Sequence, residues 1–282
     1  MKNIAIVTDS TSDLSVRLVE KTDITIVPLS VIFEGNKYID DGESILLNDF
    51  YRRLKKSDAM SLSTQPSPGD FTKVYIELLK EYQSIISIHI SSKLSGTFNS
   101  AVLARRQLKE ATIEVIDSEM VHMSCEFLAI EVSRMASEGM ELKEIVARVE
   151  KFKQNIDSFY CPRTLDNLIK GGRMSKIKGT FAKMLEVKPI LTLREGEISL
   201  YKKVRKWDQA KDAIADAIKE KADGSNNITL SIGDVDAEGE ADAISERLAR
   251  EIKPKEILRT DIGIVVGSHL GIGGLGVTCY IQ

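Results

Sequence analysis

The first half of the chain alternates between short apolar runs and longer amphipathic stretches. The runs are nearly continuous and rich in β-branched residues, as is typical of strands covered on both faces, and they span residues 4–8, 24–33, 84–90 and 113–117. The stretches between them carry apolar residues three and four positions apart, which predicts helices over residues 71–82, 101–108, 127–135 and 142–152. This alternation predicts parallel strands joined by crossover helices, and therefore an α/β architecture.

A different pattern begins near Cys161-Pro162. It predicts short helices at 165–169 and 181–185 around the break Gly171-Gly172, followed by a hairpin with strands at 190–193 and 198–201. Further on it predicts helices over 207–221 and 237–252, and strands over 227–232, near 257 and over 262–266. We therefore expect two α/β domains, residues 1–160 and 161–282, with the first built on a parallel sheet.

Composition narrows the function classes. The 282 residues are 43% hydrophobic and 29% charged, which is enough apolar material for a sizeable core. The 39 Lys and Arg against 42 Asp and Glu give a net charge of −3, so the chain carries no general attraction to nucleic acid or anionic lipid. A nucleic-acid partner is disfavoured.

Cysteines and hydropathy point to an intracellular chain. Cys125, Cys161 and Cys279 are widely separated and contain no C-x-x-C pair, so we expect small buried core residues rather than a zinc or redox site. The apolar run at residues 4–7 is too short for a signal sequence, and no stretch approaches the ~20 apolar residues of a membrane span. We expect a cytoplasmic protein without an integral membrane segment.

Polar clusters follow several predicted strands, at residues 8–12, 91–92 and 117–118. In open α/β sheets, ligands bind beyond the carboxyl ends of the strands. The same residue types are also the preferred N-caps of helices, and Ser10-x-x-Asp13 resembles a capping box. We therefore interpret Asp9 and Ser10 as structural.

The tail from Gly271 to Gly276 matches G-x-G-x-x-G, but we expect no dinucleotide site, because that fingerprint also needs a helix opening at the third glycine, a second strand and an acidic residue about 20 positions on, and the printed sequence offers none of these. These glycines are expected to let the backbone pass close to a ligand or to the other domain. The three histidines, His89, His122 and His269, have no metal-ligand spacing. His89 is expected to be a core or interface residue, whereas His269, in a glycine-rich loop, is a candidate ligand contact.

Taken together, these segments resemble the DegV family, the bacterial fatty-acid-binding proteins that serve a fatty acid kinase. The resemblance spans essentially the whole chain. Its carriers are VTDSTSDL at 7–14, STQPSPGDF at 63–71, SSKLSGTFNSA at 91–101, LIKGGR at 168–173, KPIL at 188–191, Arg205 and Gly267-Ser268-His269.

The resemblance implies a two-domain α/β protein that encloses one long-chain fatty acid, with its carboxylate at the domain interface. Carried over by position, the carboxylate-binding residues are Ser63, Ser95, His269 and Arg205. The family usually has Thr-Ser where this chain has Ser63-Thr64, so either hydroxyl is a candidate. Arg173 is a candidate exposed cation for docking the kinase.

The expected function is to bind a long-chain fatty acid and present its carboxylate to a separate fatty acid kinase for conversion to acyl-phosphate. That kinase would supply ATP and metal, so we expect no cofactor and no catalytic residue in this chain. The alternative is a stand-alone phosphotransferase or acyl-transfer enzyme with Asp9 or His269 as base, which ranks second because nucleotide and metal motifs are missing. The sequence leaves the fatty-acid length, its saturation and the oligomeric state open.

Overall fold

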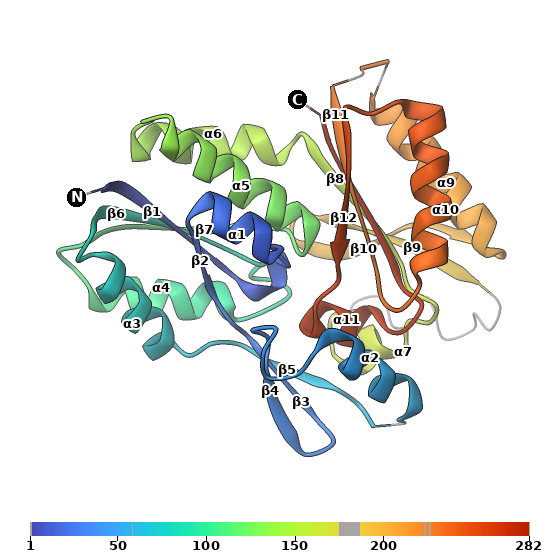
Figure 1. Ribbon diagram of the computed structural model, residues 1–282, viewed down its shortest axis with the longest axis horizontal. Coiled ribbons are helices and arrows are strands. Elements are labelled where there is room, and N and C mark those ends of the chain that lie inside the picture. The colour runs from blue at the N-terminus through green and yellow to red at the C-terminus, as the bar shows by residue number, and fades with distance from the viewer. Residues whose placement is uncertain (1, 58, 175–186, 223, 226, 282) are drawn as a thin grey trace.

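The computed structural model describes residues 2–57, 59–174, 187–222, 224–225 and 227–281. Its first layer is a parallel four-stranded sheet in the order β2-β1-β6-β7 (Figure 1). The strands are β1 (Lys2–Asp9), β2 (Ile24–Val27), β6 (Tyr82–His89) and β7 (Thr112–Asp117). The α/β architecture with a parallel sheet in the first half is confirmed.

Helices cover both faces of this sheet, as the near-continuous apolar strands require. One face packs against α1 (Val16–Thr22), α5 (Met123–Ser137) and α6 (Leu142–Lys153). The other packs against α3 (Pro68–Leu78) and α4 (Thr97–Gln107). The helix predicted over 71–82 is shorter at its C-terminal end than expected: α3 ends at Leu78, and Tyr82 already begins β6.

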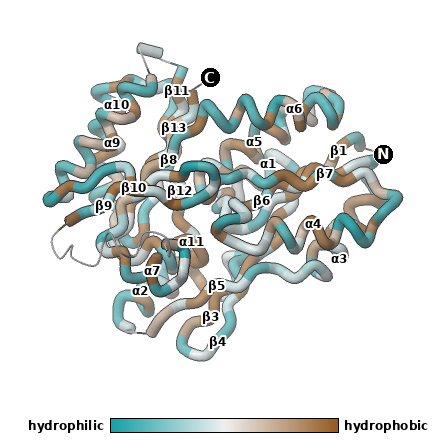
Figure 2. Tube along the Cα trace, turned by 180° about the vertical axis from the view of Figure 1, so that it is seen from behind, coloured by the Kyte–Doolittle hydropathy of each residue, from teal (hydrophilic) through white to brown (hydrophobic). Residues whose placement is uncertain are grey.

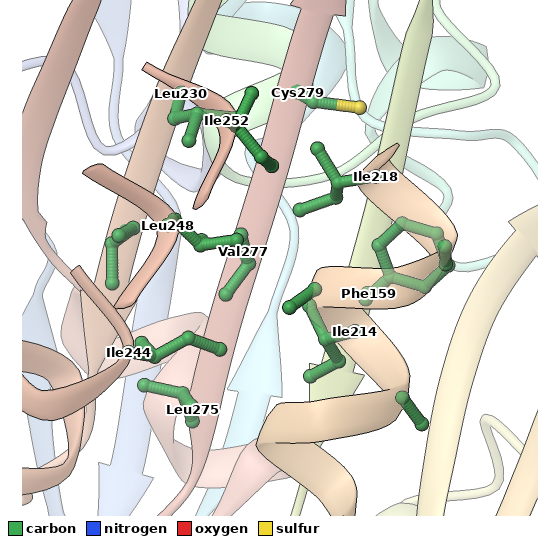
Figure 3. Packing of buried hydrophobic residues seen from close by; sticks show 14 of the residues in the cluster. Phe159, Ile214, Ile218, Leu230, Ile244, Leu248, Ile252, Leu275, Val277 and Cys279 are labelled. Atoms are coloured by element: carbon green, nitrogen blue, oxygen red, sulfur yellow. The ribbon is translucent and has the colours of Figure 1, made fainter. Parts of the chain in front are cut away.

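A second sheet of six strands has the order β10-β9-β8-β13-β11-β12 and is antiparallel except for the β11–β12 pair. Its strands are β8 (Ile156–Cys161), β9 (Lys188–Arg194), β10 (Glu197–Val204), β11 (Ile228–Asp234), β12 (Glu256–Asp261) and β13 (Leu275–Ile281). Two helices, α9 (Trp207–Ala222) and α10 (Glu238–Ile252), cover one face. Figure 3 shows Ile214, Ile218, Ile244 and Leu248 of these helices meeting Val277 of the central strand.

Helix α5 joins the two sheets into one body. It packs against β1 and β6 of the first sheet and against β8, β11 and β13 of the second. Ten of its residues are buried, which fits a helix with an apolar neighbour on nearly every side. The proposed division into residues 1–160 and 161–282 stays a prediction, and β8, which straddles it, pairs within the six-stranded sheet.

A small antiparallel sheet, β4-β3-β5, was not predicted. It contains β3 (Ser30–Phe33), β4 (Asn36–Ile39) and β5 (Leu62–Thr64), and α2 (Leu47–Lys56) lies beside it (Figure 1). The single strand predicted over 24–33 is wrong. The chain passes Pro28 between β2 and β3, and the two strands belong to different sheets.

The chain end also differs from expectation. The predicted strand at 262–266 is wrong, because α11 (Ile264–Leu270) begins there, and the glycine-rich tail leads into β13, a central strand that the pattern did not reveal. A short run of apolar residues that is buried on every side has no polar face, so periodicity cannot tell whether it is a strand or a helix. The helix predicted at 181–185 lies outside the described residues, and no described helix is long and apolar enough to cross a membrane.

Short elements at the junction complete the fold: η1 (Ser10–Ser12) after β1 and α7 (Asp166–Lys170) after β8. Asp9, not Ser10, is the N-cap of η1, and its side chain accepts a hydrogen bond from the Thr11 N–H. The capping box suggested by Ser10-x-x-Asp13 is not formed, because Asp13 instead adopts a left-handed conformation, with φ 50°. The structural interpretation of Asp9 nevertheless agrees with its burial.

Candidate functional site

A cavity lies where the two large sheets, the small sheet and α11 meet. Its walls are mostly aliphatic and come from both halves of the chain. They include Leu29, Ile90, Leu94, Leu191, Leu193 and Ile198. Such a lining suits an extended apolar ligand, because water cannot form hydrogen bonds with these side chains, whereas a hydrocarbon chain packs against them and leaves water.

Polar side chains from separate segments line the same cavity, and four of them were singled out by the sequence. Ser63 comes from β5, Ser95 from the loop before α4, Arg173 from the turn after α7, and His269 from α11. The structure thus brings together three residues that the resemblance assigned to the carboxylate and a fourth, Arg173, that it assigned to partner docking. A polar group within an otherwise apolar cavity is the arrangement expected for an amphipathic ligand.

His269 is hydrogen-bonded and electrically neutral at physiological pH. Its Nε2 lies 2.9 Å from the Ser63 Oγ. Burial, with a smaller contribution from the nearby Arg173 charge, lowers the pKa of His269 to about 4. The imidazole therefore carries one N–H and can either donate to the Ser63 oxygen or accept from its hydroxyl.

Arg173 is not the exposed cation that the sequence suggested. Its guanidinium group donates from Nε to the Leu94 carbonyl at 3.2 Å and from a terminal nitrogen to the Gly171 carbonyl at 2.7 Å. It is half-buried, and burial lowers its pKa from the ordinary arginine value. Because both of these acceptors are neutral carbonyls, its positive charge is available to an anionic ligand in the cavity.

Ser95 lies both at the start of α4 and at the cavity. Its Oγ lies 2.9 Å from the Thr97 hydroxyl and accepts a weak bond of 3.3 Å from the Thr97 N–H, at the first turn of α4. The N-cap position itself belongs to Gly96, which has no side chain to cap with. Ser95 thus supports the helix start while also lining the cavity.

Thr64 and Arg205 do not line the described part of the cavity. Thr64 follows Ser63 on β5, so its side chain points to the opposite face of the small sheet. Arg205 is exposed and lines a separate depression with Lys202 and Gln209. Of the two adjacent hydroxyls, the geometry therefore favours Ser63 as the ligand contact, and it places Arg205 apart from the other candidates.

A Ser-His-Asp arrangement lies elsewhere, deep in the first sheet. His89 Nδ1 is 3.0 Å from an Asp9 carboxylate oxygen, and His89 Nε2 is 2.7 Å from the Ser87 hydroxyl. All three residues have 0% exposure, and the Tyr75 hydroxyl donates to Ser87. This geometry resembles a hydrolase triad, but no substrate can reach the serine, so it is a core hydrogen-bond network. The expectation that His89 is a core residue is confirmed.

Several cavity residues were not predicted to belong to the site. The β9–β10 hairpin forms one wall, and its Gly196 carbonyl accepts a 2.7 Å bond from Ser91 beside the cavity. Val265 and Val266 were missed as lining residues because the segment was read as a strand rather than as part of α11. Across the described part of the chain, no group of three His, Cys, Asp or Glu side chains is arranged to hold a metal ion.

Comparisons with known proteins agree with this architecture. A family model described as "Uncharacterised protein, DegV family" matches residues 3–282. A DegV domain-containing protein of Listeria monocytogenes is 34% identical, over 100% of this chain and 99% of its own. The crystal structure of DegV, a fatty acid binding protein from Bacillus subtilis, superposes with a TM-score of 0.93 at 30% identity, with 100% of both chains covered. A DegV family protein of Thermus thermophilus, described by its fatty acid binding, has a TM-score of 0.92 at 31% identity, over 99% of this chain and 100% of that one.

Proposed function

The chain belongs to the DegV family, and from that premise we propose that its cavity binds one long-chain fatty acid and presents the carboxylate to a separate fatty acid kinase. The observation that carries the proposal is a largely aliphatic cavity whose lining also includes the Ser63 and Ser95 hydroxyls, the neutral His269 imidazole and the Arg173 guanidinium. The fatty acid binding of the Bacillus subtilis and Thermus thermophilus relatives supports the choice of ligand.

The two parts of such a ligand need different surroundings. Each buried CH₂ contributes roughly 0.8 kcal/mol, so a long tail supplies most of the binding free energy. The carboxylate loses its water on entry and needs charge-assisted hydrogen bonds in exchange. In our proposal Ser63 and Ser95 donate these bonds and Arg173 balances the charge.

The hydrogen-bond direction between Ser63 and His269 matters for this role. A serine hydroxyl has one proton, so Ser63 can donate to the ligand only if its oxygen accepts a bond from His269. That requires the tautomer with the proton on Nε2, 2.9 Å away. In this state His269 polarises Ser63 without touching the carboxylate.

The proposed phosphoryl transfer takes place on the partner kinase. A carboxylate oxygen forms a bond to the γ-phosphorus of ATP while the bond from that phosphorus to ADP breaks, and the acyl-phosphate stays in the cavity. ATP and its metal belong to the kinase, so this role belongs in the cytoplasm and needs no cofactor on this chain. Positioning and charge balance are then the chain's contribution.

A stand-alone enzyme is the second candidate function, and the positions of its two candidate bases give it little support. Asp9, one of the two bases considered, has both carboxylate oxygens occupied by Thr11, His89 and Ile90 within the core. His269 remains available, but as a neutral group bonded to Ser63. We therefore retain the binding role as the proposed function.

The test is mass spectrometry followed by a coupled assay. We expect a long-chain fatty acid to be extracted from the purified chain, and acyl-phosphate, trapped as the hydroxamate, to form only when a fatty acid kinase is added with ATP. Acyl-phosphate made by this chain and ATP alone would favour the enzyme instead. Failure to bind any fatty acid would remove the proposal.

A further inference from the structure

Helix α11 carries His269, and its neighbours come largely from the first quarter of the chain. It packs against η1, β3, α2 and β5, and also against α7. Both views place it beside α2 and α7, at the junction with the small sheet (Figures 1 and 2). The position of His269 relative to Ser63 therefore depends on how α11 is held against β5.

Two side-chain contacts link these elements in parallel. Ser63 Oγ meets His269 Nε2 at 2.9 Å, and Ser61 Oγ meets Ser268 Oγ at 2.8 Å. Ser63 lies in β5 and Ser61 directly precedes the strand, and both side chains reach α11, where Ser268 and His269 are consecutive. Ser61 is 6% exposed and Ser268 is 4% exposed, so water does not compete for their bond.

The direction of the Ser61–Ser268 bond follows from counting protons. Ser268 Oγ donates to the Ile264 carbonyl at 2.6 Å, within its own helix. A serine hydroxyl has a single proton, so Ser61 must be the donor to Ser268. The result is an oriented chain from Ser61 through Ser268 to the backbone of α11. Neither serine lines the cavity.

The residue before this pair is also fixed by a neighbour. The Tyr51 hydroxyl donates to the Ile262 carbonyl and lies against Gly267, where any side chain would overlap it. Gly267, Ser268 and His269 thus meet Tyr51, Ser61 and Ser63 in turn. The first two contacts hold α11 against α2 and the residue before β5, and the third lies at the cavity.

We propose that Ser61, acting through Ser268, is a positioning residue that holds His269 in reach of Ser63, so that the Nε2–H can donate to the Ser63 oxygen when a carboxylate is bound. This inference rests on the proposed function, because it concerns how the cavity recognises a carboxylate. Loss of the Ser61 hydroxyl lets α11 shift on β5, which lengthens the His269–Ser63 bond. Ser63 then donates less well to the head group, while the tail is bound as before.

The experiment compares a long-chain fatty acid with the alcohol of equal chain length. The ratio of their dissociation constants isolates head-group recognition from tail burial. We expect Ser61→Ala to reduce the preference for the acid about three- to tenfold, and Ser61→Thr, which keeps the hydroxyl, to restore it. Ser158→Ala is the matched control, because Ser158 and Thr278 form an equally buried hydroxyl pair of 2.8 Å in the six-stranded sheet.

A second background tests the route of the effect. In a His269→Ala protein, Ser61→Ala should change the ratio less than twofold, because the residue through which it acts is gone. ¹⁵N spectra of His269 in the fatty acid complex should show the Nε2–H tautomer in the parent and a mixture in Ser61→Ala. Should Ser61→Ala not fold, Ser268→Ala is measured in its place with the same readouts.

The outcomes separate this inference from the proposed function. An unchanged acid-to-alcohol ratio in Ser61→Ala, or an equal loss in Ser158→Ala, overturns the positioning role. An undiminished effect in the His269→Ala background overturns the route through His269. A parent protein that binds acid and alcohol equally contradicts the proposed function itself.

Discussion

At the scale of single residues, strand geometry decides which of two adjacent hydroxyl side chains faces the cavity. Ser63 and Thr64 carry the same functional group, and the sequence left both open as head-group contacts. The alternation of side chains along β5 places only Ser63 at the cavity, beside His269. No propensity could have revealed this, because β5 is a three-residue strand whose partner, β3, is far away in the chain.

This contrast gives a matched pair of variants. Ser63→Ala removes a donor to the carboxylate, so we expect the acid-over-alcohol preference to fall about tenfold. Thr64→Ala removes a hydroxyl from the other face and should change the preference less than twofold. Binding titrations of both variants with the two ligands check this, and equal losses would mean that the register of β5 has been misassigned.

The two arginines form a second pair at this scale. Arg173 offers its charge to the cavity, whereas Arg205 is exposed in another depression. Losing a charged hydrogen-bond donor to a carboxylate costs about 1.5–3 kcal/mol, so Arg173→Ala should weaken fatty acid binding by about 10- to 100-fold. Arg205→Ala should leave it unchanged. If Arg173→Ala retains full affinity but slows the coupled kinase reaction, the docking role expected from the sequence is restored.

At the scale of elements, periodicity predicted the long amphipathic helices and the parallel strands, and it failed where an element is short and buried. Helix α11 is the main example, because five of its seven residues are buried and no polar face marks its period. Strand β13 was missed for a related reason, since its glycine-rich approach suggested a loop. Both errors fall at the site, where packing between segments distant in the sequence, rather than local sequence propensity, decides the secondary structure.

Close packing between α7 and α11 makes another element testable. A Cβ on Gly171 would lie 2.7 Å from the His269 Nδ1, although the backbone there is an ordinary right-handed helical one, with φ −70°. The same Cβ would lie 2.9 Å from the Asn167 carbonyl oxygen, so Gly171→Ala should displace the imidazole, shift the end of α7 and lower the acid-over-alcohol preference several-fold. Gly239→Ala in α10, where nothing lies within 4 Å, is the control. An unaltered preference in Gly171→Ala would show that the ring position is not critical.

At the scale of the whole molecule, acidic side chains are buried where the first sheet, α5 and α11 meet. Asp13 and Asp40 accept bonds from the Gly263 and Ile264 N–H groups at the start of α11, and Glu126 on α5 lies near the Thr260 hydroxyl. Burial is the largest cause in each case. It raises the pKa of Asp13 well above its ordinary value, that of Asp40 to about 7 and that of Glu126 to about 8.

Buried histidines act in the opposite direction. Burial lowers the pKa of His122 to about 3, and that of His269 to about 4. Both are therefore neutral in the fold at pH values where the unfolded chain would protonate them. Their neutral state costs stability only below about pH 6.5, the ordinary value for histidine.

The pH dependence of unfolding above that value isolates the carboxyl groups. Between pH 6.5 and 8.5 the unfolded chain has ionised carboxylates, while folded Asp40 and Glu126 still release protons as the pH rises, so the folded state holds more protons and loses stability. With pKa values near 7 and 8, the free energy of unfolding should fall by about 2–3 kcal/mol over this range. Asp40→Asn and Glu126→Gln should each flatten the profile, whereas Glu246→Gln, on the exposed face of α10, should leave it unchanged. Urea unfolding at a series of pH values measures this directly. A stability that is level or rising up to pH 8.5 would mean that these carboxylates are ionised in the fold, and the junction would then hold buried negative charge.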